Sequence, residues 1–312
     1  MSPIHHVFAN RSNAGDWMSA RGIQKALGDI EVVEHLCDDP FVEGTLEELA
    51  SAPPSTVVVG GGGLLMDYFT PLWEGLARLV DRHRVCVWGV GYCDLKMESS
   101  RPPTELVREV ASSAEIFVVR DQHTKTILDI PSTSAPVPCP SICAIEVAPL
   151  GGSILHCNNF TTAGVDVYAY MRAACMRFAA DTDSPFEETN NRFEADRRRS
   201  LDKVLGRYER AGVVVSSALH GCIIGLAMGR PIIAVSGDHK IDSFMEAAGL
   251  DEWLLDLEDA ERLPELLSAI GDQPDSTAFL ERARAENRAV AVLVHHVVSH
   301  RGDRATAPSS TP

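Results

Sequence analysis

The sequence predicts an α/β protein made of two doubly wound, Rossmann-like domains that face each other across a cleft. Its 312 residues exceed what a single hydrophobic core usually serves. Short β-branched runs alternate with stretches of helical periodicity along most of the chain. A segment rich in proline and serine, at 130–141, divides this alternation into two halves. A cleft between two tandem α/β domains is where a ligand is expected.

The first domain is assigned to residues 1–135 and contains five predicted strands. These are HHVFAN (5–10), EVVEHL (31–36), TVVVGGGG (56–63), RVCVWGVG (84–91) and EIFVVRD (115–121). Helical periodicity lies between and after them, near 16–28, 45–52, 65–83, 103–113 and 121–129. The runs TVVV and IFVV are apolar throughout, which is typical of parallel strands buried on both faces. The pattern therefore predicts one parallel sheet covered by helices on both sides.

The second domain is assigned to residues 136–300, after a segment whose four prolines cannot continue a helix. Its predicted strands are SILHCNN (153–159), GVVVSS (212–217) and PIIAVS (231–236). Helices are predicted near 165–180, 193–211, 219–229, 238–250, 260–270 and 279–298, and residues 181–191 are predicted to form a polar loop. The tail at 301–312, rich in Pro, Ser and Thr, is predicted to be disordered.

The composition argues against several classes of function. A net charge of −16 argues against broad contact with nucleic acid or an acidic membrane, since phosphate groups are held by clustered Lys and Arg. No apolar run approaches the roughly 20 residues that cross a bilayer, and the amino terminus lacks a signal-like pattern, so we expect no membrane span and a cytoplasmic location. The apolar face of AVAVLVHHVV (289–298) must be covered by the rest of the chain or by a second copy, which leaves a homo-oligomer open.

The eight cysteines are scattered and lie mostly in apolar segments, which fits reduced, buried thiols better than a disulfide framework. The closest pair, Cys139 and Cys143, has C-x3-C spacing, and no second pair follows at a zinc-like distance. The sequence therefore predicts no metal site.

Four glycines, Gly60 to Gly63, end the predicted strand TVVV. Glycine lets the backbone approach a ligand and exposes N–H groups before a helix, which is how phosphates are held. Neither nucleotide-binding signature fits, because LLM stands where a P-loop needs Gly-Lys-Ser/Thr and no third glycine completes a dinucleotide motif. Two interpretations stay open: tight packing of strand against helix, or contact of Gly61 and Gly62 with a ligand.

Polar residues also follow the first and fifth strands of the first domain. Asn13 and Asp16, in NRSNAGDW, either cap the next helix or face the cleft, and both roles can hold at once. Arg120 closes the strand EIFVVRD, where a guanidinium is placed to form two parallel hydrogen bonds to a carboxylate or phosphate. The alternative is that Arg120 pairs with Asp121 and fixes the following helix. Its position at the carboxyl end of a parallel strand favours the ligand role.

The stretch SSALHGC joins a buried strand to a buried helix in the second domain. Ser216 and Ser217 end the strand, His220 falls in the first turn of the helix and Gly221 follows it. A structural junction has no need of a histidine, so His220 is a candidate functional residue. A helix amino terminus disfavours the imidazolium by about 0.3 to 1 kcal/mol, so the ring is expected to be neutral in an empty site and to become an acid beside a bound dianion. Lys240, at the next strand-to-helix junction, is a candidate second cation.

Together and in this order, these motifs resemble the polysaccharide pyruvyl transferase family. The matching features are the N-x-x-N-x-G-D loop at 10–16, the strand ending in GGGG, the later G-x-G at 89–91, the R-D after the fifth strand, and S-x-x-L-H-G followed by G-R-P. The resemblance implies two domains of glycosyltransferase B type. It also implies transfer of the enolpyruvyl group of phosphoenolpyruvate onto two hydroxyls of a sugar, which forms a cyclic ketal.

The resemblance further implies roles for particular residues. His220 falls on the family's functional histidine and is the candidate acid/base, with Arg120 as the second catalytic candidate. Candidates for donor binding are Ser216, Ser217, Gly221, Lys240, Gly61 and Gly62, and candidates for acceptor binding are Asn13 and Asp16. The first domain then forms the acceptor side and the second the donor side. The resemblance implies no cofactor and no metal, with phosphoenolpyruvate as donor substrate and a saccharide as acceptor.

The chain departs from the family in two ways. Many members carry Arg two residues before that histidine, where this chain has Ala218, and the second domain is short between SILHCNN and GVVVSS. Two other functions therefore stay open. One is a glycosyltransferase that uses a sugar nucleotide in the same cleft. The other is a non-catalytic, anion-binding scaffold protein.

Overall fold

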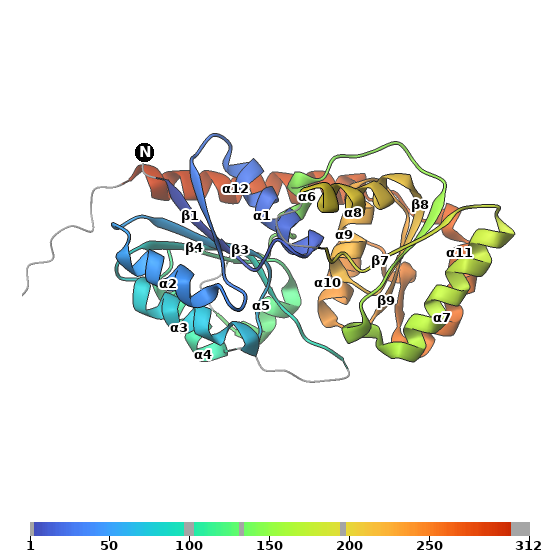
Figure 1. The fold of residues 1–312 in the computed structure, drawn as a ribbon, viewed down its shortest axis with the longest axis horizontal. Helices are drawn as coiled ribbons and strands as arrows, with labels where there is room; N and C mark the ends of the chain where they lie inside the picture. Colours follow the sequence, from blue (N-terminus) through green and yellow to red (C-terminus); the bar gives the residue numbers. More distant parts are fainter. Residues whose placement is uncertain (1–2, 97–102, 131–133, 194–197, 301–312) are drawn as a thin grey trace, which may run out of the picture.

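The computed structural model describes residues 3–96, 103–130, 134–193 and 198–300. Within these residues the chain forms two α/β domains, each built on a five-stranded parallel sheet (Figure 1). The predicted fold class is confirmed. The tail at 301–312, which the sequence predicts to be disordered, lies outside the described residues.

The first sheet has the strand order β2-β1-β3-β4-β5, and its neighbouring strands are parallel. Its strands are β1 (Ile4–Phe8), β2 (Val32–Leu36), β3 (Thr56–Leu65), β4 (Arg84–Tyr92) and β5 (Ile116–Val119). Its helices are α1 (Ala14–Leu27), α2 (Val42–Ser51), α3 (Thr70–Leu79), α4 (Thr104–Ser113) and α5 (Gln122–Leu128). Alternate residues of the strands belong to two different buried clusters, as expected for a sheet covered on both faces.

The second sheet has the strand order β10-β9-β8-β6-β7. Its strands are β6 (Ser153–Cys157), β7 (Phe186–Thr189), β8 (Ala211–Ser216), β9 (Ile232–Ser236) and β10 (Leu254–Asp256). The helices from the connection onward are α6 (Ser141–Ala144), α7 (Phe160–Asp181), α8 (Arg198–Arg210), α9 (Leu219–Ala227), α10 (His239–Ala247), α11 (Leu263–Ser268) and α12 (Thr277–Ser299). Both sheets therefore reverse their strand order beside their first strand, at β1/β3 and at β6/β8. Ligands of doubly wound sheets bind at such switch points.

Two strands of the second sheet depart from the sequence-based prediction. β7 lies inside the stretch 181–191, which is predicted as a polar loop, and β10 lies in a stretch assigned to no element. Both strands are at edges of the sheet. Edge strands are commonly short and charged, so neither FEET nor LLD carries the apolar run or the alternation that marks a buried strand.

The four glycines after TVVV do not end their strand, because β3 continues to Leu65. Gly60 pairs with Trp88 of β4 and Gly62 pairs with Val90. A Cβ on Gly60 would lie 2.0 Å from the carbonyl oxygen of Trp88, and a Cβ on Gly61 would lie 2.9 Å from the Cβ of Ser19 in α1. These close contacts support the packing interpretation of the glycines, and their contact with a ligand stays a prediction.

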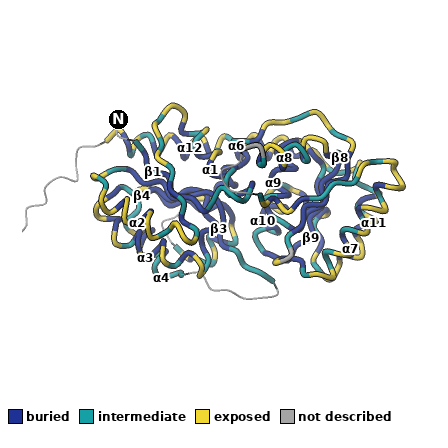
Figure 2. Tube along the Cα trace, in the orientation of Figure 1, coloured by how far each residue is buried: buried dark blue, intermediate teal, exposed yellow. Residues whose placement is uncertain are grey.

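The last helix, α12, returns to the first domain and runs along both domains (Figure 1). Its apolar face, including Val290 and Val294, is buried with Ile4 and Ile23 of the first domain. Figure 2 shows that buried and exposed positions alternate along the helices that cover the two sheets. The indole nitrogen of Trp88 donates to Asn287 Oδ1 at 3.0 Å. The rest of the chain therefore covers one face of residues 289–298, whereas Val292 and Leu293 stay exposed.

Backbone hydrogen bonds join the two domains beyond the carboxyl ends of both sheets. The N–H of Ala14 donates to the carbonyl of Asn191 at 2.8 Å. The N–H of Lys96 donates to the carbonyl of Gly237 at 2.9 Å, and the N–H of His239 donates to the carbonyl of Asp94 at 3.1 Å. These contacts fix the loops that follow β1, β4, β7 and β9 relative to one another. They set the geometry of whatever lies between the sheets.

The contact between α1 and the interdomain connection yields a stability prediction. A Cβ on Gly22 of α1 would lie 1.9 Å from the carbonyl oxygen of Pro140. Gly22→Ala is therefore expected to destabilise the protein by about 1 to 3 kcal/mol, the usual cost of overpacking a tight contact. Gly44→Ala is the matched control, because no atom lies within 4 Å of its Cβ in α2, and it is expected to be neutral or to gain up to about 1 kcal/mol. Chemical denaturation measures both, and equal unfolding midpoints for the two variants would contradict the packing account.

Candidate functional site

A cavity of about 340 Å³ lies where the carboxyl ends of the two sheets face each other. From the first domain it is lined by Asn13, Asp16, Gly63, Cys93 and Arg120. From the second domain it is lined by Asn158, Asn159, Thr161, Asn190, Asn191, Arg192, Ala218, Leu219, His220 and Lys240. The cavity thus contains side chains that follow the switch-point strands of both sheets, which is where the fold favours a ligand.

His220 reaches the cavity from the first turn of α9. Ala218 precedes the helix in an extended conformation, and His220 is the second helical residue. The ring lies against the start of α1, where a Cβ on Gly15 would be 2.0 Å from His220 Nδ1. His220 Nε2 lies 3.4 Å from Ser19 Oγ and 3.7 Å from Cys139 Sγ. These contacts hold the imidazole between the two domains.

The environment of His220 favours its neutral form. Burial, and then the charges of Arg120 and Lys240, lower the pKa of His220 to about 3. At neutral pH the ring therefore carries no charge, as the sequence predicts. An anion bound beside the two cations would oppose their effect and raise the pKa of the ring.

Arg120 presents donors that no residue in the described part of the chain satisfies. Its side chain is almost fully buried, and its Nε and Nη2 atoms have no hydrogen-bond partner there. Nε lies 3.4 Å from Asp121 Oδ2, close enough for an ion pair. Asp121 also caps α5, because its Oδ1 accepts from the N–H of Thr124 at 2.7 Å. Arg120 therefore pairs with Asp121 and keeps two donors available for a ligand, so the two sequence-based interpretations of Arg120 are compatible.

The guanidinium of Arg120 occupies space that a glycine leaves free. A Cβ on Gly91 of β4 would lie 2.1 Å from Arg120 Nε. Although burial opposes the charge, Asp121 and other neighbours raise the pKa of Arg120. Arg120 is therefore a permanent cation with unpaired N–H groups in a site screened from water, which suits a carboxylate or phosphate.

Lys240 is the second cation of the cavity. Its ammonium pairs with Asp238, which is fully buried and caps α10 by accepting from the N–H of Lys240. Burial opposes the charge, but Cys93 and Asp238 outweigh it and raise the pKa of Lys240. The lysine is charged at neutral pH and lies at the same edge of the second sheet as His220.

Asn13 and Asp16 lie on the opposite, first-domain side of the cavity. Asn13 caps α1, since its Oδ1 accepts from the N–H of Gly15 at 2.8 Å. Asp16 accepts from Asn10 Nδ2 at 3.2 Å. Burial raises the pKa of Asp16 to about 6, against the opposing charge of Arg120. Asn13 therefore both caps a helix and lines the cavity, and Asp16 is a carboxyl group that titrates near neutral pH.

Five of the residues predicted to bind the donor lie behind the cavity lining. Ser216 closes the turn before α9, with its Oγ bonded to the N–H of Ala218 at 3.0 Å. Ser217 Oγ accepts from the N–H of Asn159 at 2.9 Å. Gly221 lets the helix approach the sheet, since a Cβ there would be 2.1 Å from Ser216 Oγ. Gly61 and Gly62 lie in β3 and pack against α1. Their contacts shape the site, and their part in donor binding stays a prediction.

The sequence-based reasoning missed the amide side chains of the cavity. Asn158 and Asn159 follow β6, and Asn190 and Asn191 follow β7. The signal available was the repeated pair of asparagines, in HCNN and in ETNN, each at the carboxyl end of a strand. The second pair could not be recognised because β7 itself was not predicted.

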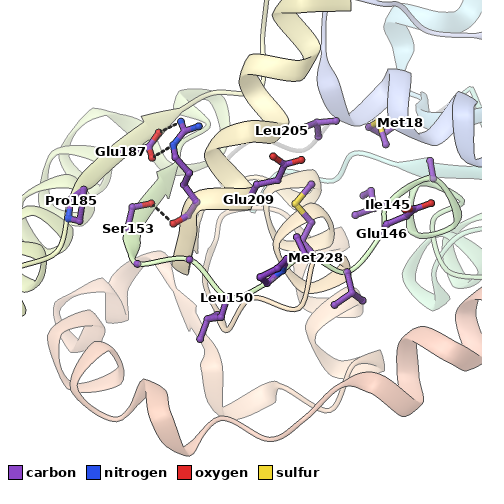
Figure 3. A pocket seen from close by; sticks show the side chains of 17 residues that line it. Met18, Ile145, Glu146, Leu150, Ser153, Pro185, Glu187, Leu205, Glu209 and Met228 are labelled. Atoms are coloured by element: carbon purple, nitrogen blue, oxygen red, sulfur yellow. Dashed lines mark hydrogen bonds and ion pairs between the residues drawn. The ribbon is translucent and has the colours of Figure 1, made fainter.

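A larger cavity lies at the opposite end of the second sheet from the cavity that contains His220. Its volume is about 1000 Å³, and Figure 3 shows Met18, Leu150 and Met228 among the side chains around it. It lies by the amino-terminal ends of β6, β7 and β8, where Arg210 pairs with Glu187. The charged groups in its lining include Glu146, Glu187 and Glu209, so it offers less to an anion than the cavity beside Arg120.

Two further expectations concern membrane-spanning helices and the cysteines. None of the helices in the described part of the chain is long and apolar enough to cross a membrane. The eight cysteines are free, and Cys93 and Cys143 are partly exposed while the others are buried. The expectation that most of the thiols are buried is confirmed.

Comparison with solved structures supports the fold. The chain resembles the Methanocaldococcus jannaschii UDP-GlcNAc 2-epimerase solved with UDP-GlcNAc and UDP, at 9% identity and a TM-score of 0.57, over 94% of this chain and 100% of that chain. It resembles the Neisseria meningitidis UDP-GlcNAc 2-epimerase at 10% identity and a TM-score of 0.57, over 96% and 100%. It resembles S. aureus MnaA, solved with UDP, at 12% identity and a TM-score of 0.55, over 96% and 97%. These similarities establish the glycosyltransferase B type of fold and leave the substrate open.

Comparison by sequence identifies the family. A search of curated proteins found no match. The family model described as polysaccharide pyruvyl transferase matches residues 13–239, which is more than half of the chain and includes Asp16, Arg120 and His220. The chain belongs to the polysaccharide pyruvyl transferase family.

Proposed function

We propose that this protein transfers the pyruvyl group of phosphoenolpyruvate onto two hydroxyls of a saccharide and forms a cyclic ketal. One observation carries the proposal. The buried guanidinium of Arg120, whose Nε and Nη2 make no hydrogen bond in the described part of the chain, lines the same cavity as His220 and Lys240. A small, multiply charged ester and a proton donor are what this reaction requires of a site.

Arg120 and Lys240 are proposed to hold the donor. The planar fork of Arg120 matches a carboxylate or phosphate and can form two parallel hydrogen bonds with it. Lys240 supplies a second, compact charge from α10. Phosphoenolpyruvate carries both kinds of anion, so it can engage both cations at once. The cavity, at about 340 Å³, falls within the range of small-molecule sites.

His220 is proposed to protonate the donor. The anionic donor offsets the charges that lower the pKa of the ring, so the imidazole becomes protonated when the donor binds. The imidazolium then gives its proton to C3 of the enol ester, and an oxocarbenium-like centre forms at C2. One acceptor hydroxyl attacks C2 and loses its proton. The C2–O bond to phosphate breaks, the second hydroxyl closes the ring and loses its proton, and inorganic phosphate leaves.

Asp16 is proposed to accept a proton from an acceptor hydroxyl. Its pKa of about 6 makes it mostly ionised at neutral pH and still basic enough to take a proton. The scheme needs no charged group beyond those of the chain and its two substrates, and we propose no cofactor. Over one turnover the hydroxyls release two protons, one of which replaces the proton given to C3 and one of which leaves with phosphate.

Incubation with phosphoenolpyruvate and a panel of saccharides bearing neighbouring free hydroxyls tests the proposal. The expected result is release of inorganic phosphate together with a product whose mass has increased by one pyruvyl ketal. Phosphate release without a ketal would indicate hydrolysis only. A wild-type protein that binds phosphoenolpyruvate but forms no ketal with any acceptor would favour the non-catalytic scaffold.

Donor binding is expected to be coupled to proton uptake. The free ring has a pKa of about 3 and is unprotonated near neutral pH, and the bound donor raises that pKa, so the complex binds more protons than the free protein. Titration calorimetry in two buffers of different ionisation enthalpy measures the protons taken up with phosphoenolpyruvate. His220→Gln, which cannot titrate, is expected to lose that uptake while still binding the donor. Equal uptake in the variant and the wild type would exclude His220 as the group that is protonated.

A further inference from the structure

The second sheet arranges the cavity side chains in a row. Its strand order places β9, β8, β6 and β7 side by side. Lys240 follows β9, His220 follows β8, Asn158 follows β6 and Asn191 follows β7. Neighbouring strands lie about 4.8 Å apart, so the residues that follow them form a row. The row has a cation at one end, the imidazole in the middle and amides at the other end. The two ends differ in the chemistry that they offer to a ligand.

Asn191 presents an unpaired donor at the amide end. The residue is 2% exposed, and its Oδ1 accepts from the hydroxyl of Tyr208 at 2.8 Å. Its Nδ2 is buried and makes no hydrogen bond to a nitrogen or oxygen atom in the described part of the chain. Its neighbour there is the thiol of Cys157, which is only a weak acceptor. The backbone of Asn191 has a φ of 61°, in the left-handed region, and its carbonyl accepts from the N–H of Ala14. The side chain is thus fixed from both ends, with the amide N–H2 left to a ligand.

Asn158 presents an unpaired acceptor beside it. The residue is 6% exposed, and its Nδ2 donates to Glu188 Oε1 at 3.4 Å. A carboxylate only accepts, so this contact sets which way the amide is turned. Glu188 is itself held by His156 Nδ1 at 3.1 Å and Arg172 Nε at 3.3 Å. The Oδ1 of Asn158 is buried, and no described residue donates to it.

The pairing of one free donor with one free acceptor selects the ligand. A buried polar group without a partner is costly, and native sites keep such groups for a ligand or an ordered water. A phosphate or carboxylate would be repelled by Asn158 Oδ1, whereas Arg120 at the other side of the cavity offers donors alone. A hydroxyl both accepts and donates, so it can satisfy both amides. Arg192, which follows Asn191, is exposed, so solvent screens its charge.

We infer that Asn158 and Asn191 form the subsite for the hydroxyls of the saccharide acceptor. The inference rests on the proposed function and assigns its two substrates to opposite ends of one row. The donor lies at Arg120 and Lys240, the acceptor lies between Asp16 and the amides, and His220 stands between them. The sequence predicts acceptor contacts from the first domain alone. In this inference they come from the second domain as well.

Two substitutions that alter one free atom each test the subsite. Asn191→Asp replaces the Nδ2 donor with an acceptor and keeps the oxygen that binds Tyr208. Asn158→Leu removes the Oδ1 acceptor at similar volume. Asn190→Asp is the charge control, because it adds the same charge at the next, exposed residue, whose Oδ1 already accepts from the N–H of Arg192. The readouts are the acceptor KM, the dissociation constant of phosphoenolpyruvate, and binding of methyl β-D-galactopyranoside and glycerol by saturation-transfer NMR.

Each test variant is expected to raise the acceptor KM about tenfold, which is the effect of losing one good hydrogen bond, and to leave phosphoenolpyruvate affinity within about twofold of wild type. The saturation-transfer signal of the probes is expected to fall in both variants and to fall less in Asn190→Asp. Unchanged acceptor KM and probe binding in folded Asn191→Asp would overturn the inference, as would a selective loss of phosphoenolpyruvate binding. If Asn158→Leu does not fold, Asn191→Asp decides alone. A wild type that binds the polyol probes through these amides but never binds phosphoenolpyruvate would refute the proposed function and keep the subsite.

Discussion

His220→Gln is expected to lower the rate of pyruvyl transfer by about 10²- to 10⁴-fold, the usual contribution of a positioned acid/base. Glutamine keeps a polar side chain at the position but cannot carry the proton to C3. Because Arg120 and Lys240 are untouched, the affinity for phosphoenolpyruvate is expected to remain close to that of the wild type. Steady-state kinetics gives kcat, calorimetry gives the donor affinity, and thermal unfolding shows whether the variant is folded.

The matched control is His296→Gln, since His296 is exposed on α12 and outside the cavity lining. It is expected to leave kcat and donor affinity unchanged. A purely structural His220 predicts a different pattern, in which His220→Gln lowers the melting temperature and the folded fraction retains full activity. That pattern would remove the imidazole from the mechanism.

Arg120→Gln is expected to weaken phosphoenolpyruvate binding about 10²-fold or more. Each hydrogen bond to a charged group contributes about 1.5 to 3 kcal/mol, and a tenfold change in affinity corresponds to about 1.4 kcal/mol. The substitution removes the N–H groups of Nε and Nη2, neither of which makes a hydrogen bond to the described residues. Arg120→Lys restores the charge without the fork, so it is expected to recover only part of the affinity.

Arg78→Gln controls for the loss of one positive charge elsewhere, because Arg78 is exposed on α3. It is expected to bind the donor like the wild type. Calorimetric titration of the variants with phosphoenolpyruvate gives the comparison. Full donor affinity in folded Arg120→Gln would mean that the anion site lies elsewhere in the molecule.

The sequence predicts the fold and the first contacts of the site because both depend on local patterns. Buried parallel strands are apolar throughout, and their carboxyl ends meet at one edge of a sheet. Arg120, His220 and Lys240 each follow such a strand, and the structure brings all of them to one cavity. Local patterns also predict two domains with a cleft between them, and the family resemblance adds that they are of glycosyltransferase B type.

The parts that could not be predicted depend on contacts between distant segments. β7 lacks an apolar run, so the sequence predicts a polar loop there. Asn190 and Asn191, which follow β7, fall in that predicted loop. The sequence leaves a packing role and a ligand contact open for Gly61 and Gly62, because their close approach to α1 is visible only in the folded chain. Asn158 contacts Glu188, and Asn191 contacts Tyr208. Both partners are distant in the sequence, so the sequence does not show which amide atoms remain without a hydrogen bond.

The central claim is that the cavity between Arg120 and His220 binds phosphoenolpyruvate as the donor. Parallel titrations of the wild type and Arg120→Gln with phosphoenolpyruvate and with UDP-N-acetylglucosamine, followed by thermal shift, test it most directly, because a bound ligand raises the melting temperature by mass action. The account predicts a concentration-dependent rise with phosphoenolpyruvate that Arg120→Gln loses, and no rise with the sugar nucleotide. A rise with UDP-N-acetylglucosamine alone would contradict it and would favour a sugar-nucleotide enzyme on the same fold.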